Sequence, residues 1–254
     1  MIHHRSTKRY FESFASILSA CIMLSFPFSP AAVAQETNSV ARPVAEPLEP
    51  DVVSPLEERL IQAGLVDVRL LDTSIRVDLK YARADNFMGA SAYGELARAY
   101  LHPEAARKLA KASRILQERY PHLRILVLDA ARPRSVQHKM WKIVAGTAMQ
   151  PYVANPHSGS MHNFGAAVDV TLYDMETQAR LDMGTAIDFF GPLAQPSLEV
   201  KFLQEGKLSE QHIQNRLIMR TAMRDAGWHV LTIEWWHFDA FPRDYTRRKY
   251  SMID

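Results

Sequence analysis

Two segments of this chain have the pattern of buried strands, yet each carries ionisable side chains. The first segment, AAVDVTLYD at residues 166–174, places Asp169 among small and branched apolar residues. The second, HVLTIEWWHFDAF at residues 229–241, places Glu234 and His237 beside two tryptophans. An ionised group is costly to bury unless it is paired, hydrogen-bonded or bound to a metal. The chain must therefore fold so that these three side chains find such partners.

Periodicity in the rest of the chain predicts an α+β fold. Apolar residues recur at helical spacing in three ranges: 102–120, 135–146 and 208–228. Two further ranges have strand patterns: 65–82, interpreted as one or two strands, and 123–133, interpreted as a buried strand that runs into a loop ended by Pro133. Helices and strands alternate irregularly, and no repeat is found. We therefore expect a single domain with helices packed on a mixed or antiparallel sheet.

The first 34 residues have the pattern of a secretory signal peptide. A basic start is followed by an apolar run at residues 14–28, which is too short and too interrupted by proline for a membrane span. Ala32 and Ala34 then offer the small residues that signal peptidase requires. The alternatives are an uncleaved membrane anchor, or a lipoprotein attached through Cys21 in the sequence LSAC. Export to the periplasm with cleavage near Ala34 is the favoured interpretation.

The next 22 residues, 35–56, separate this leader from the folded part of the chain. They hold four prolines and no glycine, and they show neither helical nor strand periodicity. Such a stretch is typical of an extended linker. We expect the folded catalytic domain to span residues 57–254.

Charge and cysteine content exclude several functions for the processed chain. The full sequence has 30 basic and 28 acidic residues, of which the leader holds three and one, so 27 of each would remain. Near-zero charge gives no basis for nucleic-acid binding. The leader also holds the only cysteine, so the processed chain has no disulfide, thiolate ligand or cysteine nucleophile. Nothing in the sequence indicates an oligomeric state.

A fourth ionisable residue completes a possible metal site. His162 lies in a turn rich in serine and glycine, seven residues before Asp169. His162, Asp169 and His237 would give three nitrogen and oxygen ligands and leave one position open, as in catalytic zinc sites, with Glu234 as a nearby base. A cap or a salt bridge is the structural alternative for Asp169. Because positions three apart on a regular strand face opposite sides, Glu234 and His237 can share a site only if the backbone is irregular at Trp235–Trp236.

The motifs around these residues resemble those of the D-alanyl-D-alanine dipeptidases, the VanX-like branch of the zinc D,D-peptidases. SMHNFGAAVD matches the signature SxHxxGxAxD, and EWWHF matches ExWH. Further stretches resemble the family in the same order, from about Leu60 onward: DLKYARADNFMG, DAARP, MGTAIDFFG and NRLIMRTAMRDAGW. DAARP has small residues before the arginine where relatives often carry glycine and an aromatic residue. The resemblance implies a Hedgehog/D,D-peptidase-like fold with one zinc ion per chain.

The resemblance also implies roles for single residues. His162, Asp169 and His237 would bind zinc, and Glu234 would act as general base and then general acid. Arg132 would stabilise the oxyanion. Three further residues would shape the substrate pocket: Ser160, Tyr81 and Asp188. Of these, Asp188 would hold the free ammonium group of the dipeptide.

The implied activity is hydrolysis of the dipeptide D-alanyl-D-alanine to two D-alanines, linked to the turnover of cell-wall peptides (peptidoglycan). One alternative is a D,D-carboxypeptidase or murein peptidase of the same superfamily, which would act on longer stem peptides. A dipeptidase needs an acid for the amino terminus of its substrate, and Asp188 favours it. The other alternative is a zinc-containing wall-binding module without turnover. Such a module would be expected to lack Glu234 or Arg132, and both are present.

Overall fold

The computed structural model describes residues 53–254. The predicted signal peptide, its alternative lipid-attachment site and most of the predicted linker lie outside these residues. Helix α1 (Pro55–Gln62) begins two residues before the expected start of the domain, because Ser54 caps it and Glu57 closes a capping box. Within residues 53–254, no helix combines the length and the apolar character needed to cross a membrane.

A mixed sheet of six strands lies at the centre. Its strands are β2 (Arg76–Val77), β4 (Leu123–Asp129), β5 (Ala167–Asp174), β6 (Ala179–Arg180), β7 (His229–Val230) and β8 (His237–Asp239). The order is β2-β4-β5-β8-β7, with β6 paired to β5, and only the β2–β4 pair is parallel. Two further strands, β1 (Val66–Asp67) and β3 (Tyr100–Leu101), form a separate antiparallel pair. The predicted mixed sheet is confirmed.

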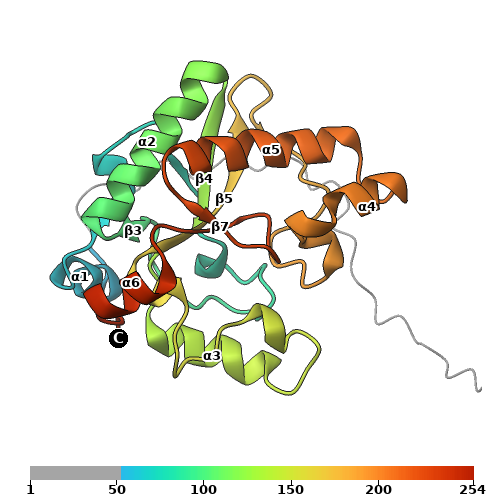
Figure 1. Ribbon diagram of the computed structural model, residues 1–254. Coiled ribbons are helices and arrows are strands. Elements are labelled where there is room, and N and C mark those ends of the chain that lie inside the picture. The colour runs from blue at the N-terminus through green and yellow to red at the C-terminus, as the bar shows by residue number, and fades with distance from the viewer. Residues whose placement is uncertain (1–52) are drawn as a thin grey trace, which may run out of the picture. The chain divides into compact units, whose positions relative to one another are not determined.

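Helices cover this sheet. The three predicted helices are present as α2 (Pro103–Arg119), α3 (Arg134–Val144) and α5 (Glu210–Asp225). Three shorter ones were not predicted: α1, α4 (Glu199–Gln204) and α6 (Arg243–Lys249). Helices α2 and α5 pack on each other and on β4 and β5 (Figure 1). Because both strands are buried along almost their whole length, their sequences are rich in apolar residues, and the few polar ones, such as Asp129 and Asp169, are buried with them. The predicted α+β class is confirmed.

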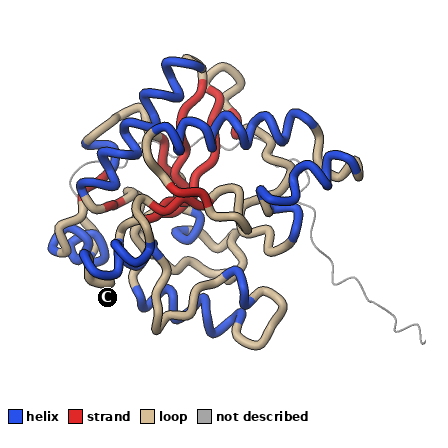
Figure 2. Tube along the Cα trace, in the orientation of Figure 1, coloured by secondary structure: helices blue, strands red, loops and turns tan. Residues whose placement is uncertain are grey.

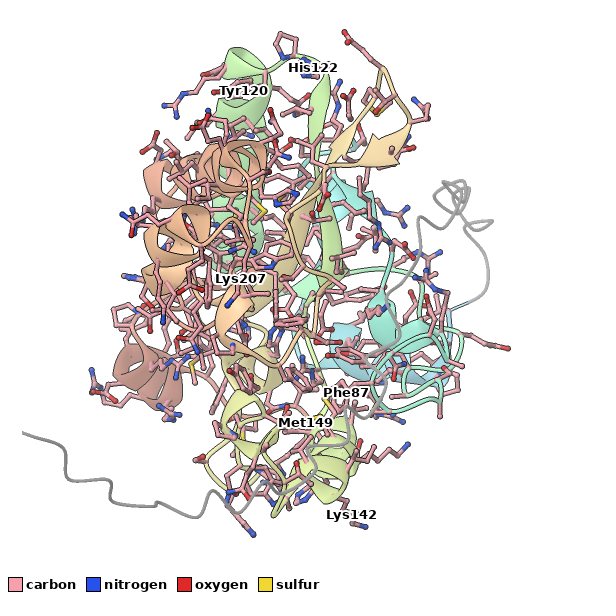
Figure 3. The ribbon with its side chains drawn as sticks, turned by 90° about the vertical axis from the view of Figure 1, so that its right-hand side faces the viewer. Phe87, Tyr120, His122, Lys142, Met149 and Lys207 are labelled. Carbon is pink, nitrogen blue, oxygen red and sulfur yellow. The ribbon has the colours of Figure 1, made fainter. Side chains whose placement is uncertain are left out.

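Short 3-10 helices fill many of the connections between these elements, and the strands form a narrow central layer between helices and loops (Figure 2). The 3-10 helices are η1 (Val68–Leu70), η2 (Lys80–Ala82), η3 (Gln150–Tyr152), η4 (Met161–Phe164), η5 (Pro192–Ala194) and η6 (Pro196–Leu198). Figure 3 shows Tyr120 and His122 at the end of the molecule where β4 begins, and Phe87 and Met149 toward the opposite end. Strand β4 therefore runs toward the loops that carry the last two residues.

The prediction of one strand over residues 229–241 is wrong. Its two ends are the strands β7 and β8, which pair with each other as a hairpin. Residues 235 and 236 form a bend, and β8 begins only at His237. The predicted irregularity at Trp235–Trp236 is therefore confirmed. The range 65–82 likewise holds two strands of two residues each, and they belong to different sheets.

Candidate metal centre and active site

Strand register brings three polar residues side by side. Asp129 at the end of β4 is paired with Asp169 on β5, and Asp169 is paired with His237 on β8. The register of β4 shifts just before Asp129, so this residue faces its neighbour across an irregular step. The two residues predicted as ligands on strands, Asp169 and His237, are thus cross-strand neighbours although they lie far apart in sequence.

The third predicted ligand, His162, lies on the short helix η4, which precedes β5. Ser160 caps this helix, and its hydroxyl oxygen accepts a hydrogen bond of 3.4 Å from the His162 backbone amide. The Asn163 side chain closes the capping box by accepting from the Ser160 amide at 2.7 Å. Gly165 ends the helix in the left-handed region at φ 58°, which glycine adopts without strain. This turn directs His162 back toward Asp169.

The three ligand atoms form a small triangle. His162 Nε2 lies 3.1 Å from His237 Nδ1 and 3.3 Å from Asp169 Oδ1, and His237 Nδ1 lies 3.1 Å from the same oxygen. Ligands of a tetrahedral zinc ion, bonded at about 2.0 Å, are separated by about 3.3 Å. All three residues are buried. The side-chain placement therefore fits one metal ion.

Hydrogen bonds on the far side of each imidazole fix its orientation. His162 Nδ1 donates to the Ala130 carbonyl at 2.7 Å, and His237 Nε2 donates to Asp239 Oδ1 at 2.8 Å. When both imidazoles are neutral, the nitrogens that face the triangle carry lone pairs, and so does the Asp169 oxygen. Three lone pairs that converge in a buried space are compensated either by a bound metal ion or by a proton on His237. The donor set of two imidazoles and one carboxylate is typical of zinc, although other divalent metals use the same ligands.

Electrostatics around the triangle favour positive charge. Burial by itself lowers the pKa of His237, but Asp239 and Asp169 outweigh burial and raise it to about 10. Burial likewise raises the pKa of Asp169, but His162 and His237 outweigh that effect and hold it well below the usual range. Asp239 is itself held at a pKa of about 2, because His237 and Arg243 overcome its burial.

Glu234, the predicted base, lies immediately before the bend that leads into β8. Its side chain is buried, and burial is the largest cause that raises its pKa to about 8. His237 opposes this rise, whereas Asp169 and Asp188 reinforce it. A carboxyl group with a pKa near neutrality can both accept and release a proton at physiological pH.

Asp188 combines backbone strain with an unpaired oxygen. Its φ of 62° lies in the left-handed region, which a residue other than glycine adopts at a cost. Oδ1 accepts a hydrogen bond from the Tyr81 hydroxyl at 2.9 Å, but Oδ2 is buried without a hydrogen-bond partner. Burial, followed by the charge of Asp169, raises the pKa of Asp188 to about 7. A strained carboxylate with a free buried oxygen is the arrangement expected of a binding group.

Arg132 lies beside both the triangle and Tyr81. Its Nε and Nη2 atoms donate to Asp129 Oδ2 at 3.0 and 2.5 Å, and Nη1 donates to Gln137 at 2.9 Å. Nη2 is 3.8 Å from Asp169 Oδ2, and Cζ is 5.2 Å from the centre of the Tyr81 ring. Three hydrogen bonds therefore fix the guanidinium beside the candidate metal site.

The structure thus brings the predicted site residues close to one another around the three candidate ligands. Ser160 takes part through its role as the N-cap of the turn that carries His162. Sequence reasoning missed the groups that support them, namely Asp129, Gln137 and Asp239. For Asp239 a signal existed, because residues two apart on a strand share a face and Asp239 follows His237 at that spacing. Asp129, three residues before Arg132, looks like an ordinary strand end, and only the fold shows its contacts.

Comparison with known proteins finds matches among the D-Ala-D-Ala dipeptidases. The family model Peptidase_M15, described as D-ala-D-ala dipeptidase, matches residues 61–253. The D-alanyl-D-alanine dipeptidase of Escherichia coli (strain K12) is 32% identical over 182 residues, which cover 69% of this chain and 83% of the relative. The enzyme of the same name from Enterococcus faecium is 28% identical over 194 residues, 67% of this chain and 90% of the relative. The enzyme of the same name from Synechocystis sp. is 29% identical over 226 residues, which cover 76% of this chain and 87% of the relative.

Proposed function

The chain belongs to the D-Ala-D-Ala dipeptidase family of metallopeptidases, Peptidase_M15, and we propose that it hydrolyses D-alanyl-D-alanine to two D-alanines. In this proposal His162, Asp169 and His237 hold one zinc ion. The observation that carries it is the triangle of three buried lone-pair atoms beside Glu234. Zinc bound there would polarise the scissile carbonyl and lower the pKa of a coordinated water molecule.

The protein's own side chains supply the proton transfers and the charge. Glu234 accepts a proton from the attacking water and passes it to the departing nitrogen, for which its pKa of about 8 suits it. Arg132 places positive charge beside Asp169, where the negative charge of the tetrahedral intermediate develops. Ser160, at the start of the turn that carries His162, contributes to the substrate pocket.

Asp188 and Tyr81 select the free amino terminus of the substrate. An ammonium group would give Asp188 Oδ2 the hydrogen bond that it lacks and would favour the ionised carboxylate. An acylated amine carries no charge and would leave a buried carboxylate without compensation. This difference supports a dipeptidase over a carboxypeptidase acting on stem peptides.

One assay tests both the substrate and the metal. Purified protein is analysed for bound metal, and D-alanine release is measured from D-Ala-D-Ala and from N-acetyl-D-Ala-D-Ala. We expect about one zinc per chain and faster turnover of the free dipeptide. The matched variant Glu234→Gln should keep its metal and lose turnover by about 10²- to 10⁴-fold. Faster turnover of the acetylated substrate, or an unaffected Glu234→Gln enzyme, would contradict the proposal.

We also propose that the protein is exported to the periplasm. The support is the order of the first 34 residues, which runs from basic to apolar to small. Cell fractionation followed by N-terminal sequencing tests this proposal. A periplasmic form beginning at Gln35 is expected, whereas a cytoplasmic form that retains residues 1–34, or a lipidated form beginning at Cys21, would refute it.

A further inference from the structure

A buried arginine lies behind the loop that carries Asp188. Arg216, on helix α5, is fully buried. Its Nε atom donates to the Met183 carbonyl at 2.8 Å, and Nη2 donates to the Leu193 carbonyl at 3.1 Å. Residues 183 and 193 are the two ends of a loop with Asp188 at its middle. One guanidinium therefore joins the two ends of this loop.

The same arginine is linked to the side of the site that holds Glu234. Its Cζ atom lies 5.6 Å from the centre of the Trp235 ring, and Trp235 directly follows Glu234. The indole nitrogen of Trp235 donates in turn to Thr185 Oγ1 at 2.7 Å, which is a third attachment of the 183–193 loop. Arg216, Trp235 and the loop thus form one connected unit beside the site.

The ion pair with Glu199 does not by itself compensate the cost of burying the Arg216 guanidinium. Arg216 Nη1 lies 3.4 Å from Glu199 Oε1, a long contact. The same carboxylate already pairs with Arg220, whose Nη2 lies 2.7 Å from Oε2. A second buried cation on one carboxylate costs desolvation and gains little from the charge. The two carbonyl bonds of Arg216 are its better contacts, and they end on the Asp188 loop.

We propose that Arg216 is a positioning residue for substrate binding: it ties the ends of the 183–193 loop together and so holds Asp188 in its strained conformation against Tyr81. Strained backbone persists only where surrounding contacts over-determine it, and the Arg216 bonds supply such contacts here. This inference rests on the proposed role of Asp188 as the ammonium-binding group.

The test compares Arg216→Lys with Arg220→Lys. Both variants keep a positive charge near Glu199, but an ammonium group cannot span the Met183 and Leu193 carbonyls as the guanidinium fork does. For Arg216→Lys we expect KM for D-Ala-D-Ala to rise about 10-fold or more, with a smaller change in kcat and unchanged zinc content. Preference for the free over the N-acetylated dipeptide should fall. For Arg220→Lys, KM and this preference should stay as in the wild type.

Hydrogen exchange gives a readout that does not depend on the substrate. Amides of residues 184–191 should exchange about 10-fold faster in Arg216→Lys than in Arg220→Lys. Unchanged exchange, or equal effects of both variants on KM, would overturn the inference. If exchange rises but the wild type does not hydrolyse D-Ala-D-Ala, the loop assignment stands and the proposed function fails.

A second variant keeps the test open if Arg216→Lys does not fold. Thr185→Val removes the Trp235 bond from the same loop while leaving both arginines and Glu199 in place. It should raise KM and increase exchange over residues 184–191 in the same sense. A Thr185→Val enzyme with wild-type KM and exchange would count against the loop as the element that positions Asp188.

Discussion

Asp239 Oδ1 accepts a hydrogen bond of 2.8 Å from His237 Nε2, on the side of the ring opposite the candidate metal site. This bond fixes which nitrogen faces the candidate site, and the negative charge of Asp239 would make that nitrogen a stronger metal ligand. We predict that Asp239→Ala weakens zinc binding by about 10- to 100-fold, measured by competition with a chromophoric chelator. Arg243→Gln, which removes only the half-exposed partner of Asp239, should change zinc affinity far less. Equal zinc affinity in wild type and Asp239→Ala would contradict the assignment.

The position of the Arg132 guanidinium depends on its hydrogen bonds to Asp129. Asp129 Oδ2 accepts two hydrogen bonds from the guanidinium, and lysine cannot reproduce this geometry. Arg132→Lys should lower kcat by about 10²- to 10³-fold while zinc content stays unchanged. Asp129→Asn should lower kcat by a smaller factor, because it leaves the arginine in place but less well held. Arg134→Gln is the control, since Arg134 begins helix α3 two residues after Arg132 but its side chain pairs with the exposed Asp254.

The raised pKa of Asp188 predicts how stability varies with pH. Its pKa is 3.8 ordinarily and about 7 in the folded protein, so the protonated carboxyl contributes stability that is complete below about pH 4 and is lost as pH rises through 7. Asparagine does not titrate. The free energy of unfolding of metal-stripped wild type, relative to Asp188→Asn, should therefore fall by about 2 kcal/mol between pH 5 and pH 8. Urea denaturation at the two pH values measures this difference.

A control for this comparison is Glu95→Gln, because Glu95 is an exposed carboxylate. Its difference from wild type should be the same at both pH values. A flat difference for Asp188→Asn as well would show that Asp188 is ionised throughout this range in the folded protein.

Two glycines with the same backbone angle separate conformational strain from steric clash. Gly94 and Gly165 both have φ of 58°, but a Cβ at Gly94 would meet nothing within 4 Å, whereas at Gly165 it would lie 2.8 Å from Leu65 Cδ2. Gly94→Ala should cost about 1 kcal/mol of stability through φ alone. Gly165→Ala should cost about 1 to 3 kcal/mol more, through the clash with a buried leucine. Zinc affinity should fall only for Gly165→Ala, because that turn carries His162.

The three residues of the candidate metal site could be found in the sequence because each is an ionisable residue in a setting that otherwise has the pattern of a buried segment. Asp169 and His237 stand out on apolar strands, and His162 stands out in a glycine-containing turn. The hairpin β7–β8 could not be predicted, because LTIEWW has the composition of a strand and contains no glycine or proline to mark its turn. Its bend was expected only because Glu234 and His237 had to reach one metal.

The supporting residues were hidden for another reason. Asp129 and Asp239 occupy strand ends, where carboxylates are common and most bind nothing. Arg216 lies in a stretch that resembles the family, but no sequence feature indicated a role for it, because an arginine on a helix is normally solvated. Their importance depends on which loops and strands lie beside them, and this information resides in the tertiary contacts.

The cross-strand register of Asp169 and His237 has a consequence for biosynthesis. His162 and Asp169 leave the ribosome together, but His237 follows Asp169 by 68 residues. Until β8 docks, the folding chain has an incomplete candidate ligand set, and residues 167–169 of β5 lack their β8 partners. Pairing of β8 covers that edge and completes the ligand set in a single event. Maturation of the metal site is thereby tied to completion of the sheet, so an arrested nascent chain that ends before His237 should be unable to acquire zinc tightly.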